Sequence, residues 1–187
     1  MWRKAKRPAG RAETETILGI LQGSRLRAAA AIAAILCAGA LHAEDWRSYR
    51  NTRFGTTADV PKDWTMSEAP ENADGRVFTS PDKRSEIIVY GGFRIFQKAQ
   101  EIADRLAPGE GETITYERQA KDWLAVSGTK GERIFYRKSL LSCHGTIWNS
   151  VSIEYPASQK KKFDALVTRV ARSLRPGRAE GLVTDCP

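Results

Sequence analysis

Histidine and cysteine are scarce in this chain, which has two histidines and three cysteines among 187 residues. A transition-metal site needs several such side chains close together, and a Ser-His-Asp hydrolase needs a histidine base. Beyond residue 43 the one histidine is His144, and the sequence contains no Gly-x-Ser-x-Gly motif. We therefore expect no metal, no cofactor and no catalytic residue, and a protein that is not an enzyme.

The sequence also lacks a hydrophobic run long enough to cross a membrane, which takes about 20 apolar residues. A shorter uncharged run, residues 28–41, follows Arg25 and Arg27. A basic segment, a short apolar run and a small residue at the cut describe a secretory signal peptide. We predict cleavage between Ala43 and Glu44.

This cleavage divides the chain into two parts. Residues 1–43 are expected to form an N-terminal extension and cleaved signal peptide, and residues 44–187 a single α+β domain. The mature protein is expected to be soluble in the periplasm, and to meet a membrane only through its signal peptide during export.

Acidic residues are outnumbered, with 22 Asp and Glu against 30 Lys and Arg, for a formal charge of +8. Residues 1–43 hold seven Lys and Arg and two Asp and Glu, which leaves 23 and 20, or +3, for the mature chain. That balance is typical of an ordinary soluble surface, and we expect no nucleic-acid partner.

Loss of the leader removes Cys37 and leaves two cysteines, Cys143 and Cys186. Two cysteines in an exported domain most simply form a disulfide. The disulfide would close a loop of about 44 residues, contribute on the order of 4 kcal/mol, and tether the C-terminal tail to the domain. The alternative is a thiol enzyme in which Cys143 is reactive beside His144.

Strand patterns fill most of the mature chain. Residues 146–155 alternate, so that Ile147, Val151 and Ile153 share one face while Trp148 lies on the other. Residues 86–90 are nearly all apolar, which is typical of a central strand. Six further segments have strand character: residues 46–53, 58–64, 76–80, 113–117, 122–127 and 132–141.

Two segments have helical spacing instead. Residues 93–106 form an apolar stripe that ends before Pro108, and residues 159–174 form another, with Ser158 as the expected N-cap. Consecutive strands followed by a closing helix predict an α+β fold, with a mainly antiparallel sheet of about six to eight strands flanked by two helices.

Two turn motifs resemble parts of ligand sites without completing them. Residues 72–75 (Asn-Ala-Asp-Gly) match the middle of a calcium loop, but Pro70 stands where the first carboxylate belongs. Gly91 and Gly92 lie between a strand and a helix, but no Walker lysine follows them. We interpret the first motif as a plain turn and the glycine pair as a sharp bend.

Several segments resemble a known family. The opening residues 49–55 (Tyr-Arg-Asn-Thr-Arg-Phe-Gly) and 60–64 (Val-Pro-Lys-Asp-Trp), and the closing strand, helix and Ser-Leu-Arg-Pro end at 173–176, resemble PsbP-like and DcrB-like domains. Residues 72–82 and 135–138 are similar to small exported bacterial proteins of unassigned function. The resemblance implies a PsbP-like sandwich and transfers no catalytic residue, because its motifs are turns and strands.

These observations favour a non-catalytic accessory or interaction protein of the cell envelope, with an unknown envelope protein as its partner. The first alternative is a periplasmic protein that binds a small ligand between the sheet and the 93–106 helix. A partner surface is expected on the basic side of the last helix, together with a tryptophan that we expect to be exposed: Lys160, Lys161, Arg169, Arg172 and Trp148. The alternative, that these basic residues only form a solvated helix face and bind no partner, stays open.

Overall fold

The structure is a computed structural model that describes residues 45–177. The predicted leader, the cleavage site at Ala43 and Glu44, and Cys186 lie outside these residues.

Within residues 45–177 the chain forms nine strands, two α-helices and one short 3-10 helix. In chain order they are β1 (Trp46–Arg50), β2 (Thr57–Pro61), β3 (Thr65–Met66), β4 (Gly75–Thr79), β5 (Glu86–Phe93), α2 (Lys98–Leu106), β6 (Glu112–Ala120), β7 (Trp123–Lys130), β8 (Arg133–Ser142), β9 (Ile147–Pro156), η1 (Ala157–Gln159) and α3 (Lys160–Ser173).

Seven strands make one antiparallel sheet in the order β3-β4-β5-β9-β8-β7-β6, and β1 pairs with β2 in a separate two-stranded sheet. The predicted α+β class with a mainly antiparallel sheet and two helices is confirmed. At one edge the sheet ends in β3, which has two residues, and at the other in β6, which has nine.

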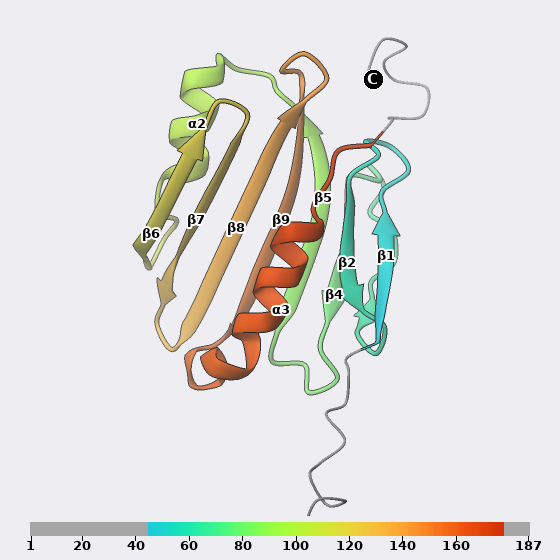
Figure 1. Cartoon of the computed structure of the whole chain (residues 1–187), viewed down its shortest axis with the longest axis vertical. Coiled ribbons are helices and arrows are strands. Elements are labelled where there is room, and N and C mark those ends of the chain that lie inside the picture. Colours follow the sequence, from blue (N-terminus) through green and yellow to red (C-terminus); the bar gives the residue numbers. More distant parts are fainter. Residues whose placement is uncertain (1–44, 178–187) are drawn as a thin grey trace, which may run out of the picture. The chain divides into compact units, whose positions relative to one another are not determined.

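The main core lies on the face of the sheet that α3 covers. Figure 1 shows α3 in front of the sheet, with β1 and β2 beside it. Val151, Ile153 and Tyr155 of β9 point to this face and pack with Phe163 and Val170 of α3. From Val151 to Tyr155 every second residue of β9 therefore enters the main core, as the alternation predicts.

The opposite face carries a smaller cluster beneath α2. Leu124, Leu141 and Trp148 form it, and Ile102 and Leu106 of α2 pack against them. The register pairs Leu141 with Trp148, which is out of phase with the residues that face α3. The two helices therefore cover opposite faces of one sheet, α3 over its middle and α2 over the β7–β9 side.

The helices begin later than the sequence predicts. Helix α2 begins at Lys98 rather than at 93, because the backbone N–H of Arg94 donates to the carbonyl of Thr146 and so continues the pairing of β5 with β9. Helix α3 begins at Lys160, with Gln159 as its N-cap and no side-chain cap. Ser158 lies inside η1, so its expected capping role is wrong.

The interpretation of Gly91 and Gly92 as a sharp bend is also wrong. Both lie within the regular pairing of β5 with β9. A side chain at Gly91 would collide with Phe54, whereas a side chain at Gly92 would meet nothing within 4 Å. Gly91 therefore makes room for an aromatic ring that lies against the strand.

Candidate functional site

A stretch of sheet beside α3 is left uncovered. Helix α3 packs against β2 and β9 and reaches only the near side of β8, so β7 and β6 extend beyond it. Tyr116 of β6 is in register with Ser127, and Ser127 with Tyr136 of β8, so both tyrosines lie on the α3 face. Trp123 is in register with Leu140 and shares that face.

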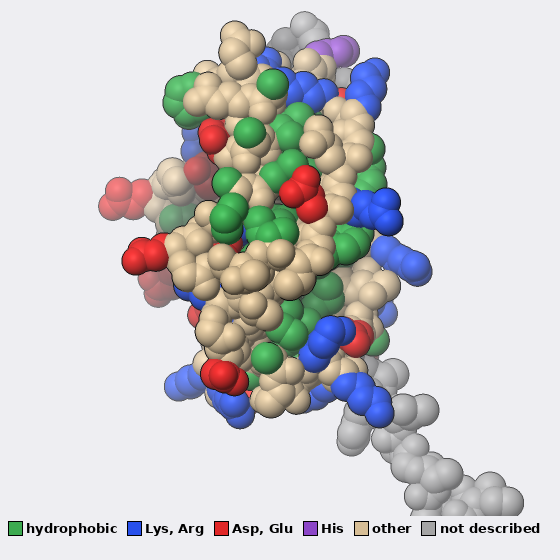
Figure 2. Space-filling model, turned by 90° about the vertical axis from the view of Figure 1, so that its left-hand side faces the viewer, with side chains coloured by type: hydrophobic (Ala, Val, Ile, Leu, Met, Phe, Trp, Pro, Cys, Tyr) green, Lys and Arg blue, Asp and Glu red, His purple; other side chains and the backbone are tan. Residues whose placement is uncertain are grey.

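These side chains form the floor of a groove of about 470 Å³, which we name the aromatic groove. Tyr116 is 46% exposed and Trp123 is 37% exposed, which is unusual for large hydrophobic side chains. Figure 2 shows the molecule from the β6 side, with hydrophobic side chains along the middle of the view and Lys and Arg side chains along its right-hand side. The lining residues are Tyr116, Trp123, Ala125, Tyr136, Lys138, Leu140, Val167, Thr168, Ala171 and Arg172.

Lys138 places a positive charge inside this apolar groove. Its Nζ donates to the carbonyl oxygen of Ala171 at 2.7 Å, near the C-terminal end of α3. Burial lowers the pKa of Lys138 below its ordinary value of 10.5. The ammonium has three N–H donors, so donors beyond the one used by Ala171 can meet a bound anion.

The charged side chains that line the groove are all positive. Lys138 and Arg172 are the charged residues of its lining, which contains no carboxylate and no histidine. Burial raises the pKa of Tyr136, so its hydroxyl stays neutral at ordinary pH. The arrangement suits the binding of an apolar or aromatic group that carries a negative charge.

The basic side chains of α3 differ in their surroundings. Lys160 pairs with Asp164 at 2.7 Å, and Arg169 pairs with Asp59 at 3.4 Å and lies over the ring of Trp46. Lys161 and Arg172 are exposed and form no ion pair among the described residues, and Arg172 lines the aromatic groove. The partner surface on this side of α3 stays a prediction, and of its basic residues Arg172 lies at the aromatic groove.

Trp148 is not an exposed partner residue, and this expectation is wrong. It is 1% exposed beneath α2, on the opposite face of the sheet from α3. Its Nε1 donates to the Oε2 of Glu101 at 2.6 Å, and the Arg105 guanidinium lies over its ring. A sequence alternation tells which residues share a face, but not whether a helix covers that face.

Cys143 and His144 form the turn between β8 and β9, both with positive φ. Cys143 is 7% exposed and packs against Phe54 and Ile147, a position that restricts access to its sulfur. The predicted partner, Cys186, lies outside the described residues, so the disulfide stays a prediction.

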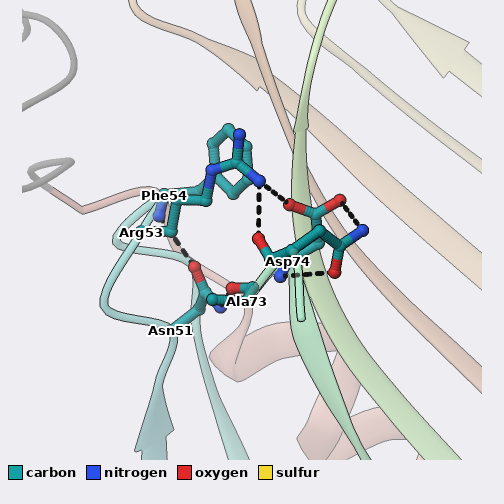
Figure 3. Close-up of polar contacts among 6 residues, drawn as sticks. Asn51, Arg53, Phe54, Ala73 and Asp74 are labelled. Atoms are coloured by element: carbon teal, nitrogen blue, oxygen red, sulfur yellow. Dashed lines mark hydrogen bonds and ion pairs between the residues drawn. The ribbon is translucent and has the colours of Figure 1, made fainter. Parts of the chain in front are cut away.

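The motifs that carry the family resemblance form a structural clasp. The Asn51 side chain accepts from the N–H of Phe54 at 2.7 Å and donates to the carbonyl of Ala73 at 2.8 Å. Arg53 pairs with Asp74 at 2.6 Å (Figure 3). The turn spans residues 70–73, Gly75 already begins β4, and the segment that follows β1 holds residues 72–74 in place.

The ligand hollow expected between the sheet and α2 is occupied by protein. Ile102 and Leu106 fill that interface together with Trp148. A hollow of about 490 Å³ lies instead beside the N-terminal end of α2, and Arg94, Lys98, Lys121 and His144 are among its lining residues.

Comparisons with known proteins bear on the fold. No protein-family model and no curated protein sequence matches this chain. The solution structure of CyanoP, the cyanobacterial PsbP of Synechocystis sp. PCC 6803, is similar to it with a TM-score of 0.55 and 13% identity, over 74% of this chain and 96% of that one. The fold is PsbP-like.

Two other solved structures resemble this PsbP-like fold at lower scores. The Ran-binding protein Mog1p of Saccharomyces cerevisiae has a TM-score of 0.49 and 10% identity, over 71% of this chain and 96% of its own. LpqN of Mycobacterium tuberculosis, involved in cell envelope biogenesis, has a TM-score of 0.49 and 12% identity, over 72% and 91%. Such identities concern the fold alone.

Sequence reasoning missed the aromatic groove. Tyr116, Trp123 and Tyr136 come from three strands, and only their register brings them to one face. The available signal was the row of residues that alternate with core positions in 132–141, which places Tyr136 and Lys138 together on one side of that strand.

Proposed function

We propose that this protein is a non-catalytic accessory protein of the cell envelope that binds a partner through the aromatic groove. The observation that carries the proposal is the groove itself: an uncovered part of a sheet face, lined by aromatic side chains and by two cations without a carboxylate. Exposed aromatic side chains beside a cation are typical of binding surfaces. The partner segment we expect is apolar or aromatic with an acidic group beside it.

The location is part of the proposal. It rests on the basic segment, the apolar run and the small residue at Ala43, which together are typical of a secretory leader. An exported protein of this fold without a catalytic constellation fits an accessory role in the periplasm.

Site-specific photo-crosslinking in the producing cells tests the groove. A photoreactive phenylalanine analogue at Tyr116 is compared with the same analogue at Met66, which is 44% exposed against 46% for Tyr116 and lies on β3 at the far edge of the sheet. We expect one discrete cross-linked species from Tyr116 and none from Met66. Equal labelling from both positions would count against the groove.

The charge of Lys138 provides the second arm of the test. Lys138→Gln keeps a donor for the carbonyl of Ala171 but removes the positive charge from the groove. Loss of a charge-assisted hydrogen bond weakens binding by about tenfold. A cross-link at Tyr116 that is unchanged by Lys138→Gln would mean that the partner does not use this cation.

A small anionic ligand is the second candidate, because the groove volume of about 470 Å³ lies in the range of small-molecule sites. Native mass spectrometry separates the two candidates. An extra mass that denaturation removes would identify a ligand, and a bare protein that still cross-links through Tyr116 would identify a protein partner.

A further inference from the structure

The loop between β5 and α2 presents three large apolar side chains to solvent. Ile95 is 77% exposed, Phe96 is 53% exposed, and Phe93, the last residue of β5, is 40% exposed. We name these three residues the apolar tip. They lie within four consecutive positions, so they form one patch rather than the scattered exposed residues that most surfaces carry.

Hydrogen bonds hold this loop in place from inside the molecule. The Oε1 of Glu101 accepts from the backbone N–H of Ile95 at 2.6 Å and of Phe96 at 2.8 Å. Glu101 is 7% exposed, and its other oxygen accepts from Trp148. A buried carboxylate thus fixes the backbone while the side chains of Ile95 and Phe96 point outward.

Arg94 anchors the same loop to the β8–β9 turn. Its Nε donates to the carbonyl of Gly145 and its Nη1 to the carbonyl of Phe96 at 2.7 Å. The ring of Phe93 packs edge-to-face on Phe54, with centroids 5.1 Å apart. The apolar tip is therefore preorganised, and little conformational entropy remains to be lost when it meets another surface.

A basic hollow adjoins the tip. It has a volume of about 490 Å³, and its charged lining is Arg94, Lys98 and Lys121 against one carboxylate, Asp122, which pairs with Lys98 at 3.1 Å. His144 lies in the same hollow. The hollow therefore carries an excess of positive charge beside the apolar tip. This arrangement complements a phospholipid, in which a negatively charged head group adjoins hydrocarbon.

We propose that the apolar tip inserts into the surface of a bilayer that contains anionic phospholipid, with phosphate groups held at the basic hollow. Three side chains on one loop are too few for a stable protein–protein interface, which buries about 800 Å² per partner. Ile95 projects rather than lining a groove, so a protein partner would need a matching pocket, whereas a bilayer accepts the projection directly. The mature domain would then contact a membrane independently of its signal peptide and of the aromatic groove.

Sedimentation with lipid vesicles tests this proposal on the purified protein. We expect binding to vesicles of phosphatidylglycerol and phosphatidylcholine, and little binding to phosphatidylcholine alone. Ile95→Ser should weaken binding by about tenfold, and Ile95→Ser with Phe96→Ser by about a hundredfold, because each removes an apolar side chain from the bilayer. Lys121→Gln should weaken binding less and reduce its sensitivity to salt.

Met66→Ser is the matched control, since Met66 is an exposed hydrophobic residue far from the tip. Met66 is in register with Phe78, and Phe78 with Ile87 near the start of β5, whereas Phe93 ends that strand. This variant should bind vesicles as the unchanged protein does. Circular dichroism on all variants should show one fold, because Ile95 and Phe96 keep their backbone bonds to Glu101.

Four results would overturn the proposal. One is a folded protein that fails to sediment with anionic vesicles. Another is binding that the tip variants leave unchanged, which would mean plain electrostatic adsorption. The third is binding of free inorganic phosphate that matches the binding of vesicles. A variant with Ile95→Trp adds a readout by comparison with the unchanged protein, which carries Trp46, Trp64, Trp123 and Trp148. Brominated lipid in anionic vesicles should quench the variant's fluorescence more than that of the unchanged protein, and equal quenching of the two would also overturn the proposal.

Discussion

Asn51 shows how one buried amide can hold two segments together. It is 3% exposed, and its side chain joins the N–H of Phe54 to the carbonyl of Ala73, a residue whose φ is 50°. Asn51→Ala would leave a buried donor and a buried acceptor without this partner. We expect a loss of about 2 to 4 kcal/mol in the free energy of unfolding, measured by urea denaturation.

Asn51→Asp is the control for that prediction. It keeps the acceptor for Phe54 but replaces the donor that Ala73 uses with a second oxygen. The loss should include the repulsion between two oxygen atoms, so Asp should be no better than Ala. A variant with Ala that unfolds at the same urea concentration as the unchanged protein would contradict the role assigned to Asn51.

Glu101 predicts a dependence of stability on pH. Burial alone raises the pKa of Glu101, but hydrogen bonds from Phe96, Ile95 and Trp148 outweigh it, and the pKa lies below its ordinary value of 4.5. The unfolded chain therefore binds this proton more readily than the folded protein. The stability that ionised Glu101 contributes is fully present above about pH 4.5 and is lost as the pH falls through the lower pKa of the folded state.

The measurement is the urea midpoint between about pH 7 and about pH 3 for the unchanged protein and for Glu101→Gln. The variant should be less stable at neutral pH, and the difference should shrink as the pH falls. Glu112 pairs with Arg137 and also has a lowered pKa, so it makes the stability of both proteins fall with decreasing pH. Two parallel curves would show that Glu101 does not act through its charge.

At the scale of elements, the contact between β5 and the segment after β1 gives a matched pair of substitutions. A Cβ at Gly91 would collide with Phe54, and one at Gly92 would meet open space. Gly91→Ala should therefore destabilise the protein by about 1 to 3 kcal/mol or more, while Gly92→Ala should be neutral or slightly stabilising. Thermal unfolding of the two variants measures the difference, and equal melting temperatures would contradict the packing of Phe54 on β5.

Local patterns predicted most strands, because alternating apolar residues mark a strand, and β9 confirms that strand. The alternation did not show that β9 is also buried on its second face, at Trp148 and Ser150. The start of α2 was not predictable from its apolar spacing, since Phe93 and Arg94 continue the pairing of β5 with β9 through tertiary contacts. The aromatic groove was hidden for a related reason. The groove exists because α3 covers β9 and leaves the same face of β7 without a covering helix. The spacing of apolar residues in a single strand does not show where a helix will pack.

At the scale of the whole molecule, the order of the strands in the sheet could not be predicted from the spacing of apolar residues either. The long hairpins β6–β7–β8–β9 follow from short connections, but the insertion of β9 beside β5 joins strands that are distant in sequence. The family resemblance supplied the antiparallel sheet between helices, and the similarity to CyanoP agrees with it. The resemblance did not supply a site, because its motifs at Asn51 and Asp74 build the clasp.

Export and the disulfide make one prediction for the mature chain. The intact mass of protein recovered from the periplasm should begin at Glu44 and be lower by two hydrogens than the fully reduced form. Cys186→Ser should lower the melting temperature by on the order of 10 °C, since it opens a loop of about 44 residues. An unchanged melting temperature, or a mass that includes residues 1–43, would contradict the corresponding part of the prediction.

The unequal edges of the sheet have a consequence for self-association. Edge strands are the places where β-proteins stack on one another, and a fibre needs two of them on each molecule. Here β3 offers two residues, and β6 offers nine with a register shift between Ile114 and Tyr116 that interrupts regular pairing. A second molecule could therefore pair with the seven-stranded sheet at β6, whereas the two-residue edge at β3 offers a third molecule little backbone to pair with.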